Sequence, residues 1–197
     1  MAARAKTRRR LDPEIRRQEL IEAAERLLRR RGPDVRVEDV VREAGAAKGT
    51  FYVYFPTWED LLETLRDRSI RAFDLAFPVP VGKVADLDWL CLVERLAVAF
   101  VDGVVAMGGL HTVLFHTDFA QRRPLSDDDT PIGRLIAIVR AGGEAGAFAD
   151  VDATLVGRLL FAVIHETADA VVAGADRKRA LVAMRRVLRK TLERDVR

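Results

Sequence analysis

Residues 37–62, VEDVVREAGAAKGTFYVYFPTWEDLL, constrain the fold of this chain more than any other segment. They predict a short amphipathic helix, a three-residue turn that opens on glycine, a second short helix and a capped third helix. Two short helices joined by a tight turn are typical of DNA-reading elements, in which one helix braces the other against the major groove. The segment therefore predicts a helix-turn-helix.

The first short helix is indicated by apolar residues at helical spacing. Val37, Val40, Val41 and Ala44 form one stripe, and the charged residues between them fall on the other side. Gly45 follows at the position where a left-handed helix cap favours glycine. The helix is therefore expected to end there and the chain to turn.

The second short helix is expected to begin near Lys48. Phe51 and Phe55 lie one turn apart, so both are expected to face inward. Tyr52 and Val53 then point outward into solvent. This helix would thus carry one buried face and one exposed face.

Capping residues mark the neighbouring boundaries. Asp12 followed by Pro13 predicts the start of a first helix that runs to about Arg31. Pro56 ends the second short helix, because proline disfavours a helical conformation at the preceding residue. Thr57 is expected to cap the next helix.

These motifs closely resemble the TetR family of bacterial transcription regulators. The resemblance covers roughly the first third of the chain. It rests on Gly45, on the runs 48–52, 54–56 and 59–62, and on the preceding helix and its exit, with Ile21, Ala23, Ala24, Leu27, Leu28 and Gly32. It implies an all-α fold with about nine helices. A DNA-binding domain over residues 1–56 would precede a helical ligand-binding and dimerisation domain over residues 57–197.

The resemblance also implies which side chains meet DNA: Lys48, Gly49, Thr50, Tyr52, Val53 and Tyr54. Threonine and valine would touch thymine methyls, and the lysine would reach guanine or phosphate. Glycine would let the helix lie close to DNA, and the tyrosine hydroxyls would meet phosphate oxygens. Tyr54 has an alternative place in the core beside Phe51.

Three positions depart from the family pattern. Ala47 stands where Ser or Thr often caps the recognition helix. Trp58 stands where the family commonly has a phosphate-binding lysine. Because its side chain offers one N–H and no charge, Trp58 could instead pack at the domain junction. The usual Ser or Thr near Val35 and Arg36 is missing, and Asp34 is the expected cap of the second helix.

Positive charge gathers in the segment expected to meet phosphate. Residues 1–56 hold 14 Lys and Arg against 9 Asp and Glu, a net +5, whereas residues 57–197 hold 19 against 21, a net −2. Residues 1–11 are expected to be a disordered basic arm. The arm is either a phosphate or minor-groove contact or a solubilising tail, and its charges are Arg4, Lys6, Arg8, Arg9 and Arg10.

Composition indicates a cytoplasmic protein. The single cysteine, Cys91, excludes an intrachain disulfide and favours a reducing compartment. No apolar run approaches a membrane span, and the basic N-terminus is not followed by the apolar core of a signal peptide. No membrane partner is therefore expected.

The rest of the chain is expected to be helical, because its valines lie in helical patterns rather than in alternation. Breaks are expected at 78–82 and 122–130, and helices over about 57–77, 88–107, 110–121, 132–141, 152–173 and 176–194.

The last two helices carry apolar stripes that are either ordinary core or the seam of a homodimer. Two long helices from each chain can pair across a two-fold axis as a four-helix bundle, as the resemblance also implies. A dimer would span half-sites separated by whole turns of the double helix, roughly 34–36 Å each. The stripes are Val156, Leu160, Val163, Thr167 and Val171 in the first helix, and Leu181, Met184, Leu188 and Leu192 in the second.

Residues 89–161 are rich in aromatic side chains with a few polar groups, the composition of a small-molecule pocket, and His165 follows on the next helix. The alternative for any one of them is the hydrophobic core. The candidate ligand-binding residues are Trp89, Phe100, Met107, His111, Phe115, His116, Phe119, Phe148 and His165. The identity of such an effector is not encoded in this pattern.

Catalytic, metal and cofactor signatures are weak. His165 and Glu166 faintly echo a zinc-protease helix without its second histidine. One cysteine and three scattered histidines give no closed metal-ligand set, so no metal and no cofactor are expected. The acidic run 127–129 indicates a solvated loop. An enzyme is therefore not expected.

The sequence predicts a sequence-specific transcriptional regulator, a dimeric repressor released from a double-stranded DNA operator by a small molecule. Two alternatives remain open: a non-specific architectural DNA-binding protein and an all-α enzyme. Comparing specific with random DNA at fixed salt would separate the first alternative from the regulator.

Overall fold

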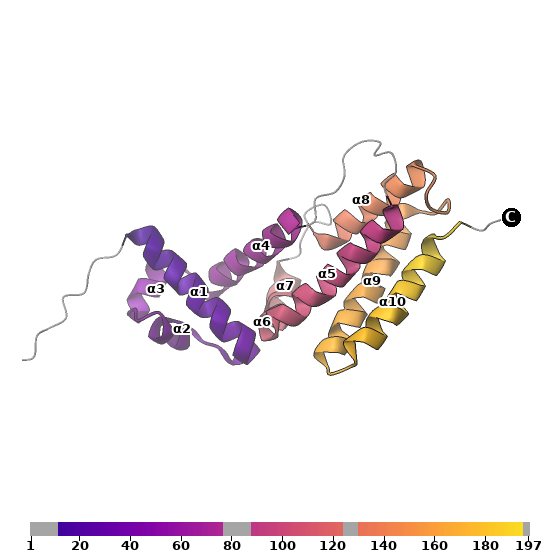
Figure 1. Cartoon of the computed structure of the whole chain (residues 1–197). Helices are drawn as coiled ribbons and strands as arrows, with labels where there is room; N and C mark the ends of the chain where they lie inside the picture. Colours follow the sequence, from indigo (N-terminus) through magenta and orange to yellow (C-terminus); the bar gives the residue numbers. More distant parts are fainter. Residues whose placement is uncertain (1–11, 77–87, 124–129, 195–197) are drawn as a thin grey trace, which may run out of the picture.

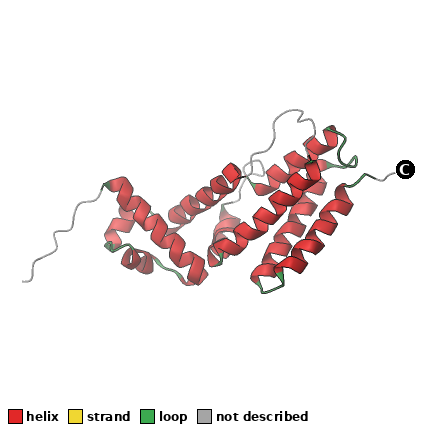
Figure 2. Ribbon diagram, in the orientation of Figure 1, coloured by secondary structure: helices red, strands yellow, loops and turns green. Residues whose placement is uncertain are grey.

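The computed structural model describes residues 12–76, 88–123 and 130–194. Over these residues the chain forms α-helices, one 3-10 turn and no strand (Figures 1 and 2), which confirms the all-α fold class. The basic arm, the break at 78–82 and the acidic run 127–129 lie outside the described residues. The helices are α1 (Pro13–Arg31), α2 (Val37–Glu43), α3 (Lys48–Tyr54), α4 (Trp58–Ala76), α5 (Trp89–Met107), α6 (Gly109–Phe115), α7 (Asp118–Arg122), α8 (Pro131–Glu144), α9 (Ala153–Val172) and α10 (Arg177–Leu192).

Helix ends follow the predicted caps in the N-terminal half. The Asp12 side chain accepts a hydrogen bond from the Glu14 amide at 2.9 Å, and Pro13 opens α1. Thr57 and Asp60 cap each other ahead of α4: the Thr57 amide donates to the Asp60 carboxylate at 2.9 Å, and the Asp60 amide donates to the Thr57 hydroxyl at 3.2 Å. These local bonds satisfy amides that have no partner within the helix.

Two predicted helix boundaries are wrong. The helix expected over 110–121 is divided into α6 and α7, since His116 and Thr117 leave the helical conformation. The helix expected to stop at residue 141 continues through Gly142 and Gly143 to Glu144. Gly142 is buried against the ring of Phe148, where any Cβ would collide with the ring, so tertiary packing overrides the helix-breaking tendency of glycine.

The chain is elongated, with α1–α3 at one end and α8–α10 at the other (Figure 1). Two hydrophobic cores lie along it. The N-terminal core joins α1–α3 to Leu61, Leu62 and Leu65 of α4 and to Leu110 and Leu114 of α6. The C-terminal core joins α5, α8, α9 and α10. The N-terminal core therefore extends across the domain boundary proposed at residue 56.

The apolar stripe of α10 belongs to the chain's own core. Leu181, Met184, Leu188 and Leu192 are all buried, and Leu160 of α9 lies in the same core. The core alternative therefore accounts for these residues, and a dimer would have to use other side chains of α9 and α10. Among the described residues, no helix combines the length and apolar character that crossing a membrane requires.

Glycines bring the two halves of the molecule into backbone contact. Gly32 ends α1 with φ 56°, and the Cα and N of Gly32 would lie only 2.7 Å from a Cβ added to Gly109. The Arg29 guanidinium donates to the carbonyl of Ala106 at 2.8 Å beside this contact. The end of α1 is thus held directly against the start of α6.

Replacing Gly109 with alanine tests this contact. We expect Gly109→Ala to destabilise the fold by about 1–3 kcal/mol, because the new methyl group meets backbone rather than a mobile side chain. The melting temperature should fall by roughly 2–12 °C. Gly143→Ala is the matched control, since nothing lies within 4 Å of its added Cβ. Equal melting temperatures for the two variants would contradict the tight contact.

Candidate functional site

The helix-turn-helix forms as the sequence predicts, with one corrected cap. Gly45 adopts φ 60°, and the Ala46 amide closes the turn by donating to the Val41 carbonyl at 2.8 Å. Asp34 does not cap α2, because it lies in the 3-10 turn (Gly32–Asp34). Arg36 occupies the cap position, and its amide donates to the Asp39 carboxylate at 3.1 Å.

The inner face of α3 is fixed by aromatic packing. Phe51 and Phe55 are fully buried, with ring centroids 5.5 Å apart. Trp58 is half-buried and stacks on Phe51 at a centroid distance of 6.3 Å and an interplanar angle of 25°. Trp58 therefore packs on the N-terminal core, as its structural alternative predicts.

The outer face of α3 is exposed. Tyr52 and Val53 are 46% and 76% exposed, although both are large hydrophobic or aromatic residues. Lys48 and Gly49 are also exposed, and the space beside Gly49 is open. Thr50 and Tyr54 are half-buried. Tyr54 contacts the N-terminal core while part of it stays exposed, so it is intermediate between the predicted DNA-facing position and the predicted core position. The outer face of α3 is thus open to solvent.

An ion pair lies at the N-terminal end of this surface. The Lys48 ammonium is 2.5 Å from the Glu38 carboxylate of α2. Hydrogen bonding to Glu38 raises the pKa of Lys48, and hydrogen bonding to Lys48 lowers the pKa of Glu38, so both groups stay charged at neutral pH. Because both groups are exposed, the pair adds little stability.

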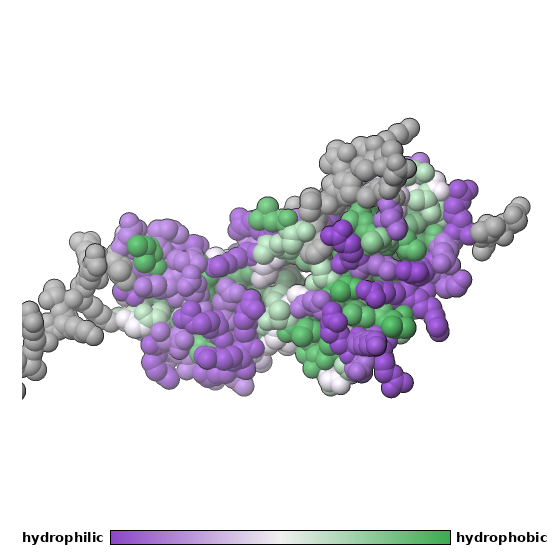
Figure 3. Space-filling view, in the orientation of Figure 1, coloured by the Kyte–Doolittle hydropathy of each residue, from purple (hydrophilic) through white to green (hydrophobic). Residues whose placement is uncertain are grey.

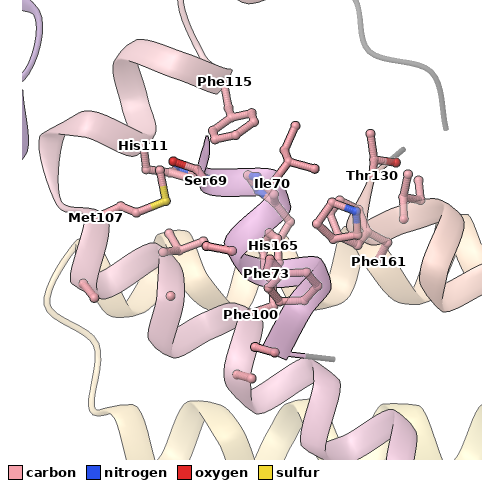
Figure 4. A pocket seen from close by; sticks show the side chains of 18 of the residues that line it. Ser69, Ile70, Phe73, Phe100, Met107, His111, Phe115, Thr130, Phe161 and His165 are labelled. Carbon is pink, nitrogen blue, oxygen red and sulfur yellow. The ribbon is translucent and has the colours of Figure 1, made fainter. Parts of the chain in front are cut away.

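A second candidate site is a cavity of about 580 Å³ between α4, α5, α6, α8 and α9 (Figure 4). Five of the predicted ligand-binding residues line it: Phe100, Met107, His111, Phe115 and His165. The sequence missed the contribution of α4, which supplies Ser69, Ile70 and Phe73, and that of Phe161 on α9. Ile70, Phe73 and Phe161 have the helical spacing of core residues. Sequence spacing cannot distinguish a core residue from a cavity-lining one, because that difference depends on how the helices pack around the cavity.

Four predicted pocket residues lie elsewhere. Trp89 and Phe148 are buried in the C-terminal core, where Phe148 packs on Gly142. Phe119 is buried in the N-terminal core, with the guanidinium of Arg66 4.8 Å above its ring. His116 is exposed beside the cavity rather than lining it.

The polar groups of the cavity are few. Ser69 donates its hydroxyl to the Leu65 carbonyl at 2.9 Å, so it is already satisfied. His111 is buried, and this burial together with the neighbouring imidazoles of His116 and His165 lowers the pKa of His111 to about 4. His111 is therefore neutral near pH 7 and has a lone pair with which to accept a hydrogen bond.

The positions of the three histidines in the sequence suggested that they were scattered, but the structure brings them together. Ring centroids of His111, His116 and His165 are 4.9–5.4 Å apart. The fold brings the three rings together from α6, from the residue that follows it and from α9, so the description of these histidines as scattered is wrong.

Comparisons with known proteins support this architecture. Residues 20–65 match a family model described as "Bacterial regulatory proteins, tetR family". The HTH-type transcriptional regulator EthR of Mycobacterium tuberculosis is 39% identical over 70 residues, which are 35% of this chain and 32% of that protein. The match thus spans about a third of the length of this curated relative.

Solved structures extend the likeness to nearly the whole chain. A TetR transcription regulator from Haloarcula marismortui superposes with a TM-score of 0.71 at 21% identity, covering 91% of this chain and 100% of that one. NalD of Pseudomonas aeruginosa, the secondary repressor of a multidrug efflux pump, gives 0.66 at 18% identity, covering 93% and 100%. At these identities the superpositions establish the fold.

Filling the cavity tests whether it binds small molecules. Gly103 of α5 lines the cavity, and nothing lies within 4 Å of its added Cβ. We expect Gly103→Ala to stabilise the chain by about 1 kcal/mol through helix propensity, while the cavity stays open to an apolar fluorescent dye. Gly103→Trp should fill the cavity and abolish dye binding measured by fluorescence titration. Equal dye affinity in both variants would contradict a binding role.

Proposed function

Because the chain belongs to the TetR family of bacterial regulatory proteins, we propose that it represses transcription as a sequence-specific DNA-binding dimer that a small molecule releases from its operator. The observation that carries this proposal is the exposed face of α3, with Tyr52 and Val53 in solvent and Phe51 locked beneath them.

The outer face of α3 suits the major groove. Val53 is placed to contact thymine methyls, Gly49 allows close approach of the backbone, and Tyr52 can donate its hydroxyl to a phosphate. The net +5 of residues 1–56 supplies attraction to the phosphate backbone. Direct readout by this face, added to that attraction, distinguishes a regulator from a protein that merely coats DNA.

A dimer is favoured by apolar side chains that the chain's own core does not cover. Leu155 and Leu159 of α9 and Val182 and Val187 of α10 are all exposed. Hydrophobic areas gather over the C-terminal helices in Figure 3, whereas the N-terminal part is mainly hydrophilic on the same face. Pairing of α9 and α10 with their copies would bury these residues as a four-helix bundle.

The cavity and the helix-turn-helix share structural elements, which supports control by a ligand. α4 and α6 both line the cavity and contribute to the N-terminal core. Arg29 of α1 also lines the cavity while it is bonded to Ala106. A ligand that favours a different arrangement of α4 or α6 would therefore change the spacing of the two α3 helices in a dimer and weaken operator binding.

Repression and its release are tested with DNA chosen by the protein itself. Fragments selected from a random pool should bind far more tightly than unselected DNA at the same salt concentration. Placed upstream of a reporter gene, a selected fragment should lower expression when the chain is present. Equal affinity for both DNAs would favour the architectural alternative, and increased expression would identify an activator.

We expect Tyr52→Ala to weaken binding to selected DNA by roughly 10- to 100-fold, the loss of about 1.5–3 kcal/mol for a hydrogen bond to a charged group. The circular dichroism and melting temperature should be retained, because the side chain is exposed. Leu75→Ala is the matched control, since Leu75 is an 85% exposed hydrophobic residue of α4 away from α3. Unchanged affinity of the Tyr52 variant for selected DNA would contradict the proposal that α3 contacts the operator.

We expect Leu159→Glu to convert the dimer to monomers and to reduce operator affinity, since a buried carboxylate at a two-fold seam faces its own copy. Sedimentation velocity at micromolar protein measures the change. Leu75→Glu introduces the same charge at another exposed leucine and should leave the dimer intact. A dimer that persists in the Leu159 variant would place the interface elsewhere.

A further inference from the structure

The chain contains three histidines, and all three meet at one edge of the cavity. His111 lies on α6, His116 directly follows that helix, and His165 comes from α9. One ring nitrogen from each lies within 4.8 Å of those of the other two. His111 and His165 also line the cavity, where Figure 4 shows them among its aromatic side chains.

The spacing of the rings fits a single small ion. Zinc binds imidazole nitrogen at about 2.0–2.1 Å in tetrahedral geometry, which places the ring centroids about 5.2 Å apart. The three centroid distances are 4.9, 5.4 and 5.0 Å. The rings therefore stand at about the separation of a three-histidine site, and ion binding would require the side chains to rotate until one nitrogen of each faces a common centre.

A carboxylate orients one of the three rings. Nδ1 of His165 lies 3.1 Å from the carboxylate of Asp169, one turn further along α9. If Nδ1 carries the proton, Nε2 of His165 is left as the free nitrogen. Histidine ligands of metals in proteins typically donate a hydrogen bond from their second ring N–H to a carboxylate or carbonyl in this way. Asp169 also brings a carboxylate oxygen next to the cluster of three rings.

We propose that His111, His116 and His165 form a binding site for one divalent transition-metal ion of the zinc class, with Asp169 as a positioning residue. Imidazole nitrogen is a ligand that suits zinc, copper, nickel and iron. Three protein ligands leave a fourth coordination position, and we expect it to be open to the cavity, because His111 and His165 line that cavity.

The site extends the chemistry of an otherwise apolar cavity. A bound ion would give a small molecule with an oxygen or nitrogen donor a strong anchor among the phenylalanines and methionine of the wall. This consequence for effector class rests on the proposed function. The metal site itself does not, because its test needs neither DNA nor an effector.

The experiment is a metal titration of the full chain without a histidine tag, after treatment with a chelator. We expect one Zn²⁺ per chain by isothermal titration calorimetry, and one Co²⁺ with the visible absorption of a four- or five-coordinate ion. No saturable binding, or the weak absorption of an octahedral cobalt ion, would overturn the proposal.

Variants assign the ligands. His116→Ala and His165→Ala should each abolish stoichiometric binding, and His116 is exposed, so loss of that side chain leaves the core intact. Asp169→Asn should weaken zinc binding by about 10- to 100-fold while the stoichiometry stays at one. Cys91→Ser removes the only thiol and is the control, since it should bind as the natural chain does. Binding that survives loss of His116 and His165, or that disappears with Cys91, would refute the site.

Discussion

The packing of α6 against the end of α1 sets the relation between the two halves of the molecule. Gly32 and Gly109 bring the two backbones so close that a side chain at Gly109 would push them apart. α6 then carries Leu110 and Leu114 into the N-terminal core and His111 and Phe115 into the cavity wall. The short helix α6 therefore packs in the N-terminal core beneath the helix-turn-helix and also lines the cavity. A shift of α6 would change both.

In the first part of the chain, local sequence signals were sufficient to predict the helices and their ends. Caps such as Asp12, Thr57 and Gly45 satisfy amides or adopt turn conformations within a few residues, so their effect can be predicted without tertiary information. Phe51 and Phe55 share a helix face and are buried together for the same reason. The fold class and the exposed face of α3 therefore followed from residue order.

Long-range packing decided what residue order did not. The sequence treated Phe119 and Phe148 in the same way as Phe100 and Phe115. In the structure, however, Phe119 is buried under the guanidinium of Arg66, and Phe148 is buried against Gly142 of α8. The histidines were missed for a geometric reason. Residues five apart on one regular helix, such as His111 and His116, lie about 140° apart around its axis. The break after Phe115 is what turns His116 back toward its neighbour.

The cavity has a thermodynamic consequence of its own. Unfilled volume among apolar side chains forgoes dispersion contacts that a closely packed interior would have. A compound that occupies it binds the folded chain and not the unfolded chain, so mass action shifts the folding equilibrium in proportion to its concentration and affinity. Occupancy of the cavity would thereby raise the melting temperature, so melting curves of the purified chain can screen compounds for binding.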